Sequence, residues 1–191
     1  MKILVIVLLF FVNVFSQNDR LNNTSKIIAK SFEKLEQDPA NNELQLNYIN
    51  SIPQNWSVFL SVFQPDDFGQ LYDNYSKYLS VLDTLIQNHP DQIGNLLINL
   101  STEAKWEADA TGEIQHSLAR FVANYTNKFC SILKSHSEKE INNVVEFLAD
   151  VENYNAYEEF PEIILQLKKL KEISLANKFE NAKIFRINSK H

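Results

Sequence analysis

Residues 70–88 read QLYDNYSKYLSVLDTLIQN, and this stretch decides the fold class. Its apolar residues recur at spacings of three and four, which is the period of an α-helix. On a helical wheel they form two neighbouring stripes, and polar residues fill the remaining arc. A helix that is apolar over about half of its circumference packs on two sides, so we expect it to lie centrally. The first stripe contains Tyr72, Tyr75, Leu79, Leu82 and Ile86, and the second contains Tyr78, Val81 and Leu85.

The helical period continues along nearly the whole chain, which has only 3 Gly and 5 Pro. Proline fits the first turn of a helix and not its interior, so prolines are expected to begin several helices. Ser137-Glu138-Lys139-Glu140 matches a capping box, which begins another. The predicted helices cover residues 25–37, 39–49, 70–88, 107–125, 126–135 and 138–152, and three more start at Pro53, Pro90 and Pro161. In the last of them, Ile163, Ile164, Leu167, Leu170 and Ile173 are expected to face inward.

These elements predict an all-α protein built of stacked antiparallel helical hairpins. The turns between the predicted helices are short, which favours antiparallel neighbours. Hairpins that stack in series form a HEAT-like α-superhelix. No fixed repeat period is found in the sequence, so an irregular helical bundle is the alternative architecture.

The first sixteen residues have the pattern of a secretory signal peptide. Lys2 precedes an apolar run from Ile3 to Val12, and Val14 and Ser16 stand before a polar segment. A membrane anchor is the alternative, but a spanning helix needs about 20 apolar residues. We therefore expect cleavage after Ser16, which leaves a single all-helical domain over residues 17–191 with no stable membrane anchor. The many Asn, Ile and Lys residues suggest an AT-rich genome and favour a periplasmic or secreted bacterial protein.

The charge of the chain argues against nucleic acid as a partner. The sequence has 18 Lys and Arg against 24 Asp and Glu, a net charge of -6. Cleavage would remove Lys2 and no acidic residue, which changes the net charge from -6 to -7. An acidic domain repels phosphate backbones, and no basic stripe with interleaved aromatic residues is present.

Cys130 is the only cysteine, so the chain forms no intramolecular disulfide. Its apolar neighbours Phe129, Ile132 and Leu133 predict a buried thiol that packs as a small hydrophobic side chain.

The best candidate site is a polar stripe on one predicted helix. Asp109, Glu113, His116 and Arg120 are spaced by four, three and four, which places them on one side of the helix, opposite Ile114, Leu118 and Phe121. Lys105 and Trp106 come just before this helix, and Trp106 would supply a flat anchor for a partner. A solvated face with pairs at i,i+4 is the simpler interpretation. The candidate binding residues are Lys105, Trp106, Asp109, Glu113, His116 and Arg120.

The sequence gives little support for catalysis. Glu113 and His116 form one E-x-x-H pair, whereas carboxylate-bridged metal bundles need two such pairs and two further Glu. Cys130 with His116 or His136 lacks a Gly-rich turn for an oxyanion hole. We therefore predict no catalytic residues, no metal site and no cofactor, and a protein that is not an enzyme.

The block Lys105-Trp106-Glu107-Ala108-Asp109-Ala110 resembles a KWxADA-type block in uncharacterised secreted all-helical proteins of AT-rich Gram-negative bacteria. The stretches from Tyr48 to Phe59 and from Leu71 to Leu85 are similar to earlier blocks of that group, so the resemblance covers about Leu44 to Leu148. Some small helical periplasmic proteins of this kind are similar to immunity proteins that block a toxin. The resemblance implies an all-helical fold and carries no activity.

Taken together, these features predict a non-catalytic extracytoplasmic protein-binding module, of which an immunity-type inhibitor is one form. Its partner is expected to be another protein. A second candidate surface is an acidic, aromatic loop that contains Tyr154, Tyr157 and Phe160. Two alternatives remain open: a metal-dependent hydrolase that uses Asp109, Glu113 and His116, and a carrier that holds a small ligand in an apolar groove between hairpins.

Overall fold

The computed structural model describes residues 23–64, 70–105, 109–150 and 159–188, with the side chains of the last range described from residue 161 to residue 182. The predicted signal peptide, residues 1–16, lies outside the described residues. The described chain is helical and contains no strand, which confirms the all-α prediction. In the same ranges, no helix is long and apolar enough to span a lipid bilayer.

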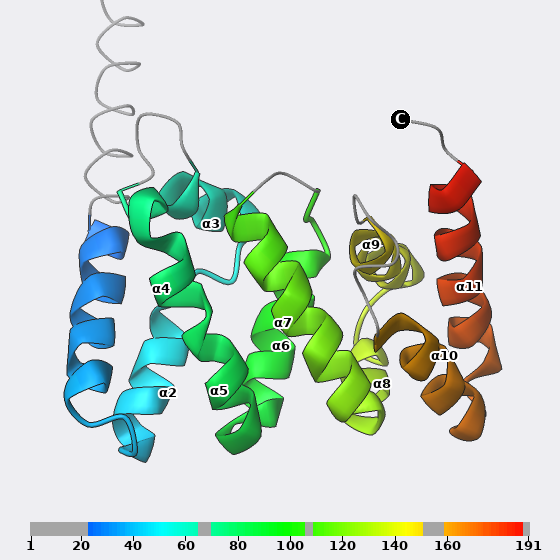
Figure 1. The fold of residues 1–191 in the computed structure, drawn as a ribbon, viewed down its shortest axis with the longest axis horizontal. Helices are drawn as coiled ribbons and strands as arrows, with labels where there is room; N and C mark the ends of the chain where they lie inside the picture. Colours follow the sequence, from blue (N-terminus) through cyan, green and yellow to red (C-terminus); the bar gives the residue numbers. More distant parts are fainter. Residues whose placement is uncertain (1–22, 65–69, 106–108, 151–158, 189–191) are drawn as a thin grey trace, which may run out of the picture. The chain divides into compact units, whose positions relative to one another are not determined.

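The helices follow one another with short connections (Figure 1). A helix over residues 23–37 comes first. It is followed by α2 (Asn42–Ser51), α3 (Trp56–Phe63), the 3₁₀ helix η1 (Tyr72–Asn74), α4 (Tyr75–Leu79), α5 (Val81–Asn88), α6 (Pro90–Ser101), α7 (Ala110–Asn124), α8 (Thr126–Leu133), α9 (Glu138–Ala149), α10 (Glu159–Lys169) and α11 (Ile173–Asn188). Two compact units are formed, and the boundary between them falls between Tyr78 and Leu79. The single domain and the HEAT-like superhelix stay predictions.

The first unit is held together by an aromatic cluster. The ring of Phe32 meets Tyr48 and Tyr78 edge-on, with centroid distances of 5.5 and 5.0 Å. Lys77 lies over the same ring, 4.9 Å from its centroid, and also pairs with Glu36 at 3.0 Å. Edge-on aromatic pairs add to the free energy of burial, so this cluster fixes how the helix of residues 23–37 packs.

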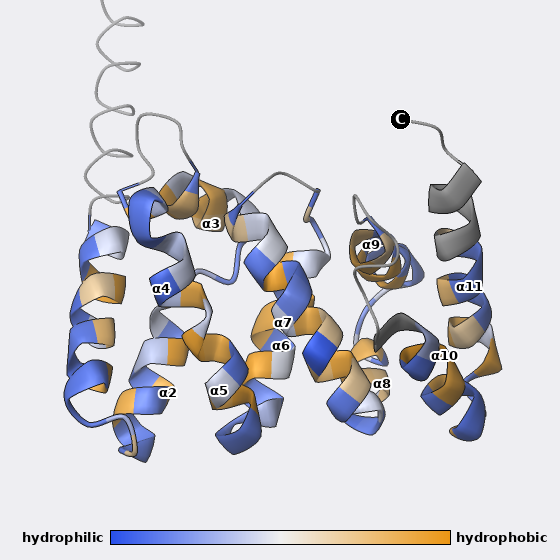
Figure 2. Ribbon diagram, in the orientation of Figure 1, coloured by the Kyte–Doolittle hydropathy of each residue, from blue (hydrophilic) through white to orange (hydrophobic). Residues whose placement is uncertain are grey.

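The second unit packs its helices around α6 and α7. α6 contacts α5, α7 and α8, while α7 also contacts α10. α11 contacts both α9 and α10. Hydrophilic and hydrophobic residues alternate around most of these helices (Figure 2), as expected of helices that bury one face. Buried side chains from each of the helices α5 to α11 form the core, among them Leu82, Leu97, Leu118, Phe129, Leu148, Leu167 and Phe179.

Several local signals in the sequence are confirmed. Pro90 is the first residue of α6, and the capping box between Ser137 and Glu140 begins α9. The predicted start of α2 at Pro39 is wrong, because Pro39 lies in a turn. The side chain of Asn41 accepts hydrogen bonds from the amides of Glu43 and Leu44, so an asparagine cap two residues later begins the helix.

The predicted helix over residues 70–88 is interrupted. It consists of η1, α4 and α5, with a break at Ser80. The hydroxyl of Tyr48 donates to the carbonyl of Tyr78 at 2.5 Å, and that carbonyl would otherwise accept the amide four residues further on. The amide of Asp83 bonds to the carbonyl of Ser80, three residues back, at 3.3 Å. A side chain that enters the helical hydrogen-bond ladder is a common cause of such a break.

The predicted long helix after Pro161 is also wrong, because it is two helices. α10 ends at Lys169 and α11 begins at Ile173, and Lys171 between them has a φ of 63°. The amide of Glu172 bonds to the carbonyl of Leu167 and that of Lys171 to Lys168, which is the pattern of a Schellman motif. Ile163 and Leu167 are buried as predicted, but Ile173 is 50% exposed because it lies beyond the break.

Candidate binding groove between α9 and α11

The polar stripe predicted from the sequence lies along α7. Asp109 directly precedes α7, and Glu113, His116 and Arg120 follow on the helix. Asp109, His116 and Arg120 are exposed and Glu113 is half-buried, whereas Ile114, Leu118 and Phe121 on the opposite side are fully buried. The predicted division of this helix into a polar side and a core side is therefore confirmed. Its role in binding stays a prediction.

Arg120 has a structural partner within the second unit. Its guanidinium forms an ion pair with the carboxylate of Asp83 on α5. The hydroxyl of buried Ser117 donates to the other oxygen of the same carboxylate at 2.6 Å. Asp83 thus joins α5 to α7, and the charge of Arg120 is already matched.

Of the two remaining predicted binding residues, the structure describes Lys105 and not Trp106. Lys105 is exposed at the end of a described range. Trp106, the proposed flat anchor, lies outside the described residues, as do residues 151–158, which include Tyr154 and Tyr157 of the second candidate surface. Phe160 lies in α10, and its side chain is outside the description too. The structure therefore describes five of the six predicted binding residues, and four of these lie at the start of α7 or along it.

The same stripe contains carboxylates and an imidazole, which are common metal ligands. Within the described ranges, no three His, Cys, Asp or Glu side chains are grouped so that they could hold a metal ion. Asp109, Glu113 and His116 follow one another along a helix, and no further carboxylate or imidazole that the structure describes completes a ligand set with them. The metal-dependent hydrolase remains an alternative that no structural observation favours.

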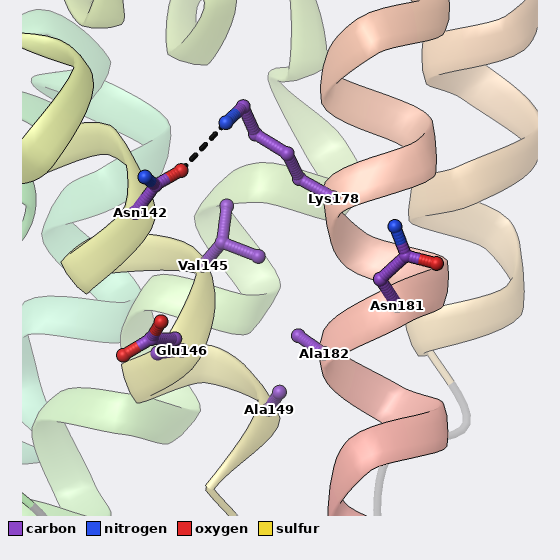
Figure 3. A pocket seen from close by; sticks show the side chains of 7 residues that line it. All are labelled: Asn142, Val145, Glu146, Ala149, Lys178, Asn181 and Ala182. Carbon is purple, nitrogen blue, oxygen red and sulfur yellow. Dashed lines mark hydrogen bonds between the residues drawn. The ribbon is translucent and has the colours of Figure 1, made fainter.

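A groove lies between α9 and α11, both in the second unit (Figure 3). Its volume is about 530 Å³. Ligand sites usually have volumes of about 300–1,000 Å³, so the groove is large enough for side chains of a partner. Three apolar residues and four polar residues line it: Val145, Ala149 and Ala182, and Asn142, Glu146, Lys178 and Asn181.

The lining residues recur at helical spacing on both walls. On α9 they stand at positions 142, 145, 146 and 149, and on α11 at positions 178, 181 and 182. Residues three and four apart lie on the same side of a helix, so each wall is one continuous face. Figure 3 shows Ala182 pointing from α11 toward α9.

Lys178 crosses from one wall to the other. Its ammonium group donates to Asn142 at 2.6 Å, the contact drawn in Figure 3, and to Glu138 at 2.5 Å. Its side chain is only 26% exposed, while that of Glu138 is 72% exposed. The positive charge of Lys178 is therefore matched at one end of the groove.

Glu146 contributes a negative charge to the α9 wall. Its side chain is exposed, and no ion pair or hydrogen bond joins it to any side chain that the structure describes. Since the charge of Lys178 is matched by Glu138, the lining as described carries a net negative charge at Glu146. A cationic group is the natural complement of such a wall.

The α9 wall is fixed at both ends by side chains from this unit. At its start, Ser137 and Glu140 form the capping box, and the hydrogen bonds from Ser137 lower the pKa of Glu140. At its end, the side chain of Gln115 on α7 donates to the carbonyls of Phe147 and Asp150, at 2.5 and 2.8 Å. The last carbonyls of a helix need partners from outside it, and Gln115 supplies a donor to them.

Sequence reasoning did not find this groove. Asn142 and Lys178 are 36 residues apart in the chain, and nothing local shows that their helices meet. One weak signal is present, because Ala149 and Ala182 are small residues on helix faces that also carry polar side chains. Small residues on two helices permit a close approach of a third element, but they do not say which helices form the pair.

Comparisons with known proteins add no family to this description. No protein-family model, no curated protein and no solved structure matches the chain.

Proposed function

We propose that this chain is a non-catalytic module that binds another protein through the groove between α9 and α11, and that it acts outside the cytoplasm as a periplasmic or secreted protein. The groove carries the proposal: two helix faces form a hollow of about 530 Å³ with an apolar floor and polar edges. Protein interfaces combine an apolar centre with a polar rim in the same way. An immunity-type inhibitor of a basic toxin is one form that such a module takes.

A location outside the cytoplasm is supported by the pattern of the first sixteen residues, and a basic partner by the negative net charge of the chain. Lys2, the apolar run and Ser16 are arranged as in a signal peptide. A net charge of -6 favours a basic partner through electrostatic steering. Intact mass of the protein recovered from its own host tests the location: the expected chain begins at Gln17, and recovery of the uncleaved chain from the cytoplasm would refute export.

The binding part is tested by cross-linking the tagged protein in the extracytoplasmic fraction of its host. Ala182→Trp fills the groove, so we expect it to abolish capture of the partner seen with the original protein. Ser131→Trp places the same side chain on an exposed position of α8 and should leave capture unchanged. His116→Trp distinguishes the two candidate surfaces: if it alone abolishes capture, the α7 stripe and not the groove binds the partner. If no protein is captured, the proposal fails.

A carrier of a small ligand is the second candidate, because the groove volume lies within the usual range for ligand sites. Native mass spectrometry of protein purified from its host separates the two functions. A bound small molecule that Ala182→Trp displaces would favour the carrier, whereas a bare chain with a cross-linked protein partner would favour the binding module.

A further inference from the structure

The chain passes from the first unit to the second once, between Tyr78 and Leu79. The break in the helix at Ser80 lies within two residues of that boundary. The boundary marks where one packed unit ends, and the break marks where the helical hydrogen bonds are interrupted, so two separate features of the structure coincide. Hinges between compact units consist of a few residues at the ends of helices or strands, and this segment is in such a place.

The backbone at the break keeps a helical shape although the run of helical hydrogen bonds is interrupted. Ser80 has a φ of -61° and a ψ of -25°, which lie in the right-handed helical region. α4 nevertheless ends at Leu79 and α5 begins at Val81. The apolar stripes of residues 70–88 continue through this point, and the segment contains no proline and no glycine. A continuous helix therefore needs new hydrogen bonds here and no large change in the dihedral angles of Ser80.

One side chain explains the interruption. The hydroxyl of Tyr48 donates to the carbonyl of Tyr78 at 2.5 Å, and in a continuous helix that carbonyl accepts the amide of Leu82. Tyr48 is fully buried on α2, and its ring packs edge-on against Phe32. A buried tyrosine hydroxyl needs a hydrogen-bond partner, and the Tyr78 carbonyl supplies one. The Tyr48 hydroxyl and the Leu82 amide are therefore alternative donors to the same carbonyl.

We propose that residues 78–82 are a hinge between the two units, and that the hydroxyl of Tyr48 sets its state. When this hydroxyl is bonded to the Tyr78 carbonyl, the helix is interrupted and the connection bends, as helices do where a side chain enters their hydrogen-bond ladder. When the hydroxyl turns away, the Leu82 amide bonds to the carbonyl, α4 and α5 join into one helix, and the connection is stiff. The hinge does not involve the groove between α9 and α11, so its test is independent of the proposed function.

Hydrogen exchange of the Leu82 amide, followed by NMR in the full-length protein, shows which donor holds the carbonyl. Tyr48→Phe removes the hydroxyl and keeps the ring, so this amide should exchange about two- to tenfold more slowly, as expected of one added backbone hydrogen bond. Tyr78→Phe is the matched control. It removes a hydroxyl from the same aromatic cluster but keeps the carbonyl that accepts the bond, so the exchange of Leu82 should not change.

Pairs of spin labels measure the bending itself, in a Cys130→Ala background. Labels at Glu33→Cys and Gln92→Cys, one exposed position in each unit, report the distance between the units. Labels at Gln92→Cys and Ser131→Cys, both exposed and both in the second unit, give the width of the distance distribution within one unit. We expect a broader distribution between the units than within the second unit. Tyr48→Phe should narrow the distribution between the units toward the width of the control pair.

Ser80→Gly tests the same hinge without a change in the core, because Ser80 is exposed, and it keeps the test valid if Tyr48→Phe does not fold. Glycine adds backbone freedom, so this variant should broaden the distribution between the units. A distribution between the units that is as narrow as the one within the second unit would overturn the inference. So would an unchanged width in Ser80→Gly, or a Tyr48→Phe variant in which either the width or the exchange of Leu82 equals that of the original protein.

Discussion

At the scale of single residues, Gly94 on α6 leaves no room for a side chain, because the ring of Phe121 on α7 packs directly against its backbone. A methyl group added at Gly94 would overlap the ring of Phe121, which is itself fully buried. Glycine within a helix costs about 0.5–1 kcal/mol relative to alanine, because it loses more backbone freedom on folding. At this position the steric requirement outweighs that cost. At Gly112, near the start of α7, an added methyl group would meet nothing within 4 Å.

The two glycines therefore predict opposite effects of one substitution. Gly94→Ala should lower the free energy of unfolding by about 1–3 kcal/mol, since inserting a methyl group into a packed core forces neighbours to move. Gly112→Ala should raise it by about 0.5–1 kcal/mol. Urea denaturation measures both. Adding Phe121→Leu to Gly94→Ala should recover part of the loss, and equal effects of the two alanines would contradict the packing described.

Cys130 is buried, as the sequence predicts, with 7% of its surface exposed. Burial, reinforced by the negative charge of Glu172, raises the pKa of its thiol to about 11. The folded state therefore holds this proton more tightly than the unfolded state. The stability contributed by the neutral thiol is fully present below the ordinary pKa of about 8.5 and is lost as the pH rises toward 11.

We expect the urea midpoint of the original protein to fall more between pH 8 and pH 10.5 than that of Cys130→Ala, because the other titrating groups are common to both. A thiol reagent such as a disulfide dye should react slowly at pH 8 until urea unfolds the chain. Parallel pH profiles of the two proteins, or fast labelling of the folded chain, would show that the thiol is not protected.

At the scale of helices, some helix ends can be predicted from the residues that form them and others cannot. The cap at Ser137 and the first-turn proline at Pro90 follow the usual pattern and were predictable. The end of α10 was not, because the left-handed position of its Schellman motif is occupied by Lys171 and not by glycine. The motif forms anyway, since the two amide-to-carbonyl bonds and the packing of α10 against α11 favour it.

The left-handed backbone at Lys171 leads us to expect that glycine at this position stabilises the protein. A left-handed backbone costs a residue with a side chain about 1–2 kcal/mol, and glycine avoids this cost. Lys171→Gly should therefore raise the free energy of unfolding by about 0.5–1 kcal/mol. Lys169→Gly, two residues earlier and inside α10, should lower it by about 1 kcal/mol. Thermal unfolding followed by circular dichroism compares them, and the proposed end of α10 is incorrect if both variants lose stability.

At the scale of the whole molecule, polar side chains connect helices that are distant in the sequence. Gln115 on α7 binds the end of α9, and Asn143 on α9 donates to the carbonyl of Thr102 at the end of α6, at 2.7 Å. Asp150 and Thr102 supply carbonyls at the ends of α9 and α6, and the carbonyl of Phe147, which also accepts the amide of Asp150 at 3.3 Å, gains a second donor. Together these bonds place α9, and with it one wall of the groove, relative to α6 and α7.

Replacing Gln115 with Glu keeps the shape of the side chain and removes both donors. The variant would bring a carboxylate close to two carbonyl oxygens, so we expect a loss of about 1–3 kcal/mol in the free energy of unfolding. Because Gln115 is 2% exposed, the loss should appear in urea denaturation at neutral pH. Gln92→Glu, at an exposed position of α6, is the matched control and should change stability by less than about 0.5 kcal/mol. Equal stability of Gln115→Glu and the original protein would refute the role of this side chain.

The sequence by itself determined the helical class, most helix positions and the side of α7 that is buried. These features depend on spacings of three and four residues and on caps within one turn, so neighbours in the chain are sufficient to predict them. The break at Ser80 and the groove between α9 and α11 depend on the tertiary structure. Tyr48 reaches Tyr78 across 30 residues, and Lys178 reaches Asn142 across 36. Such contacts depend on which helices pack together and in which register, and no local spacing records that choice.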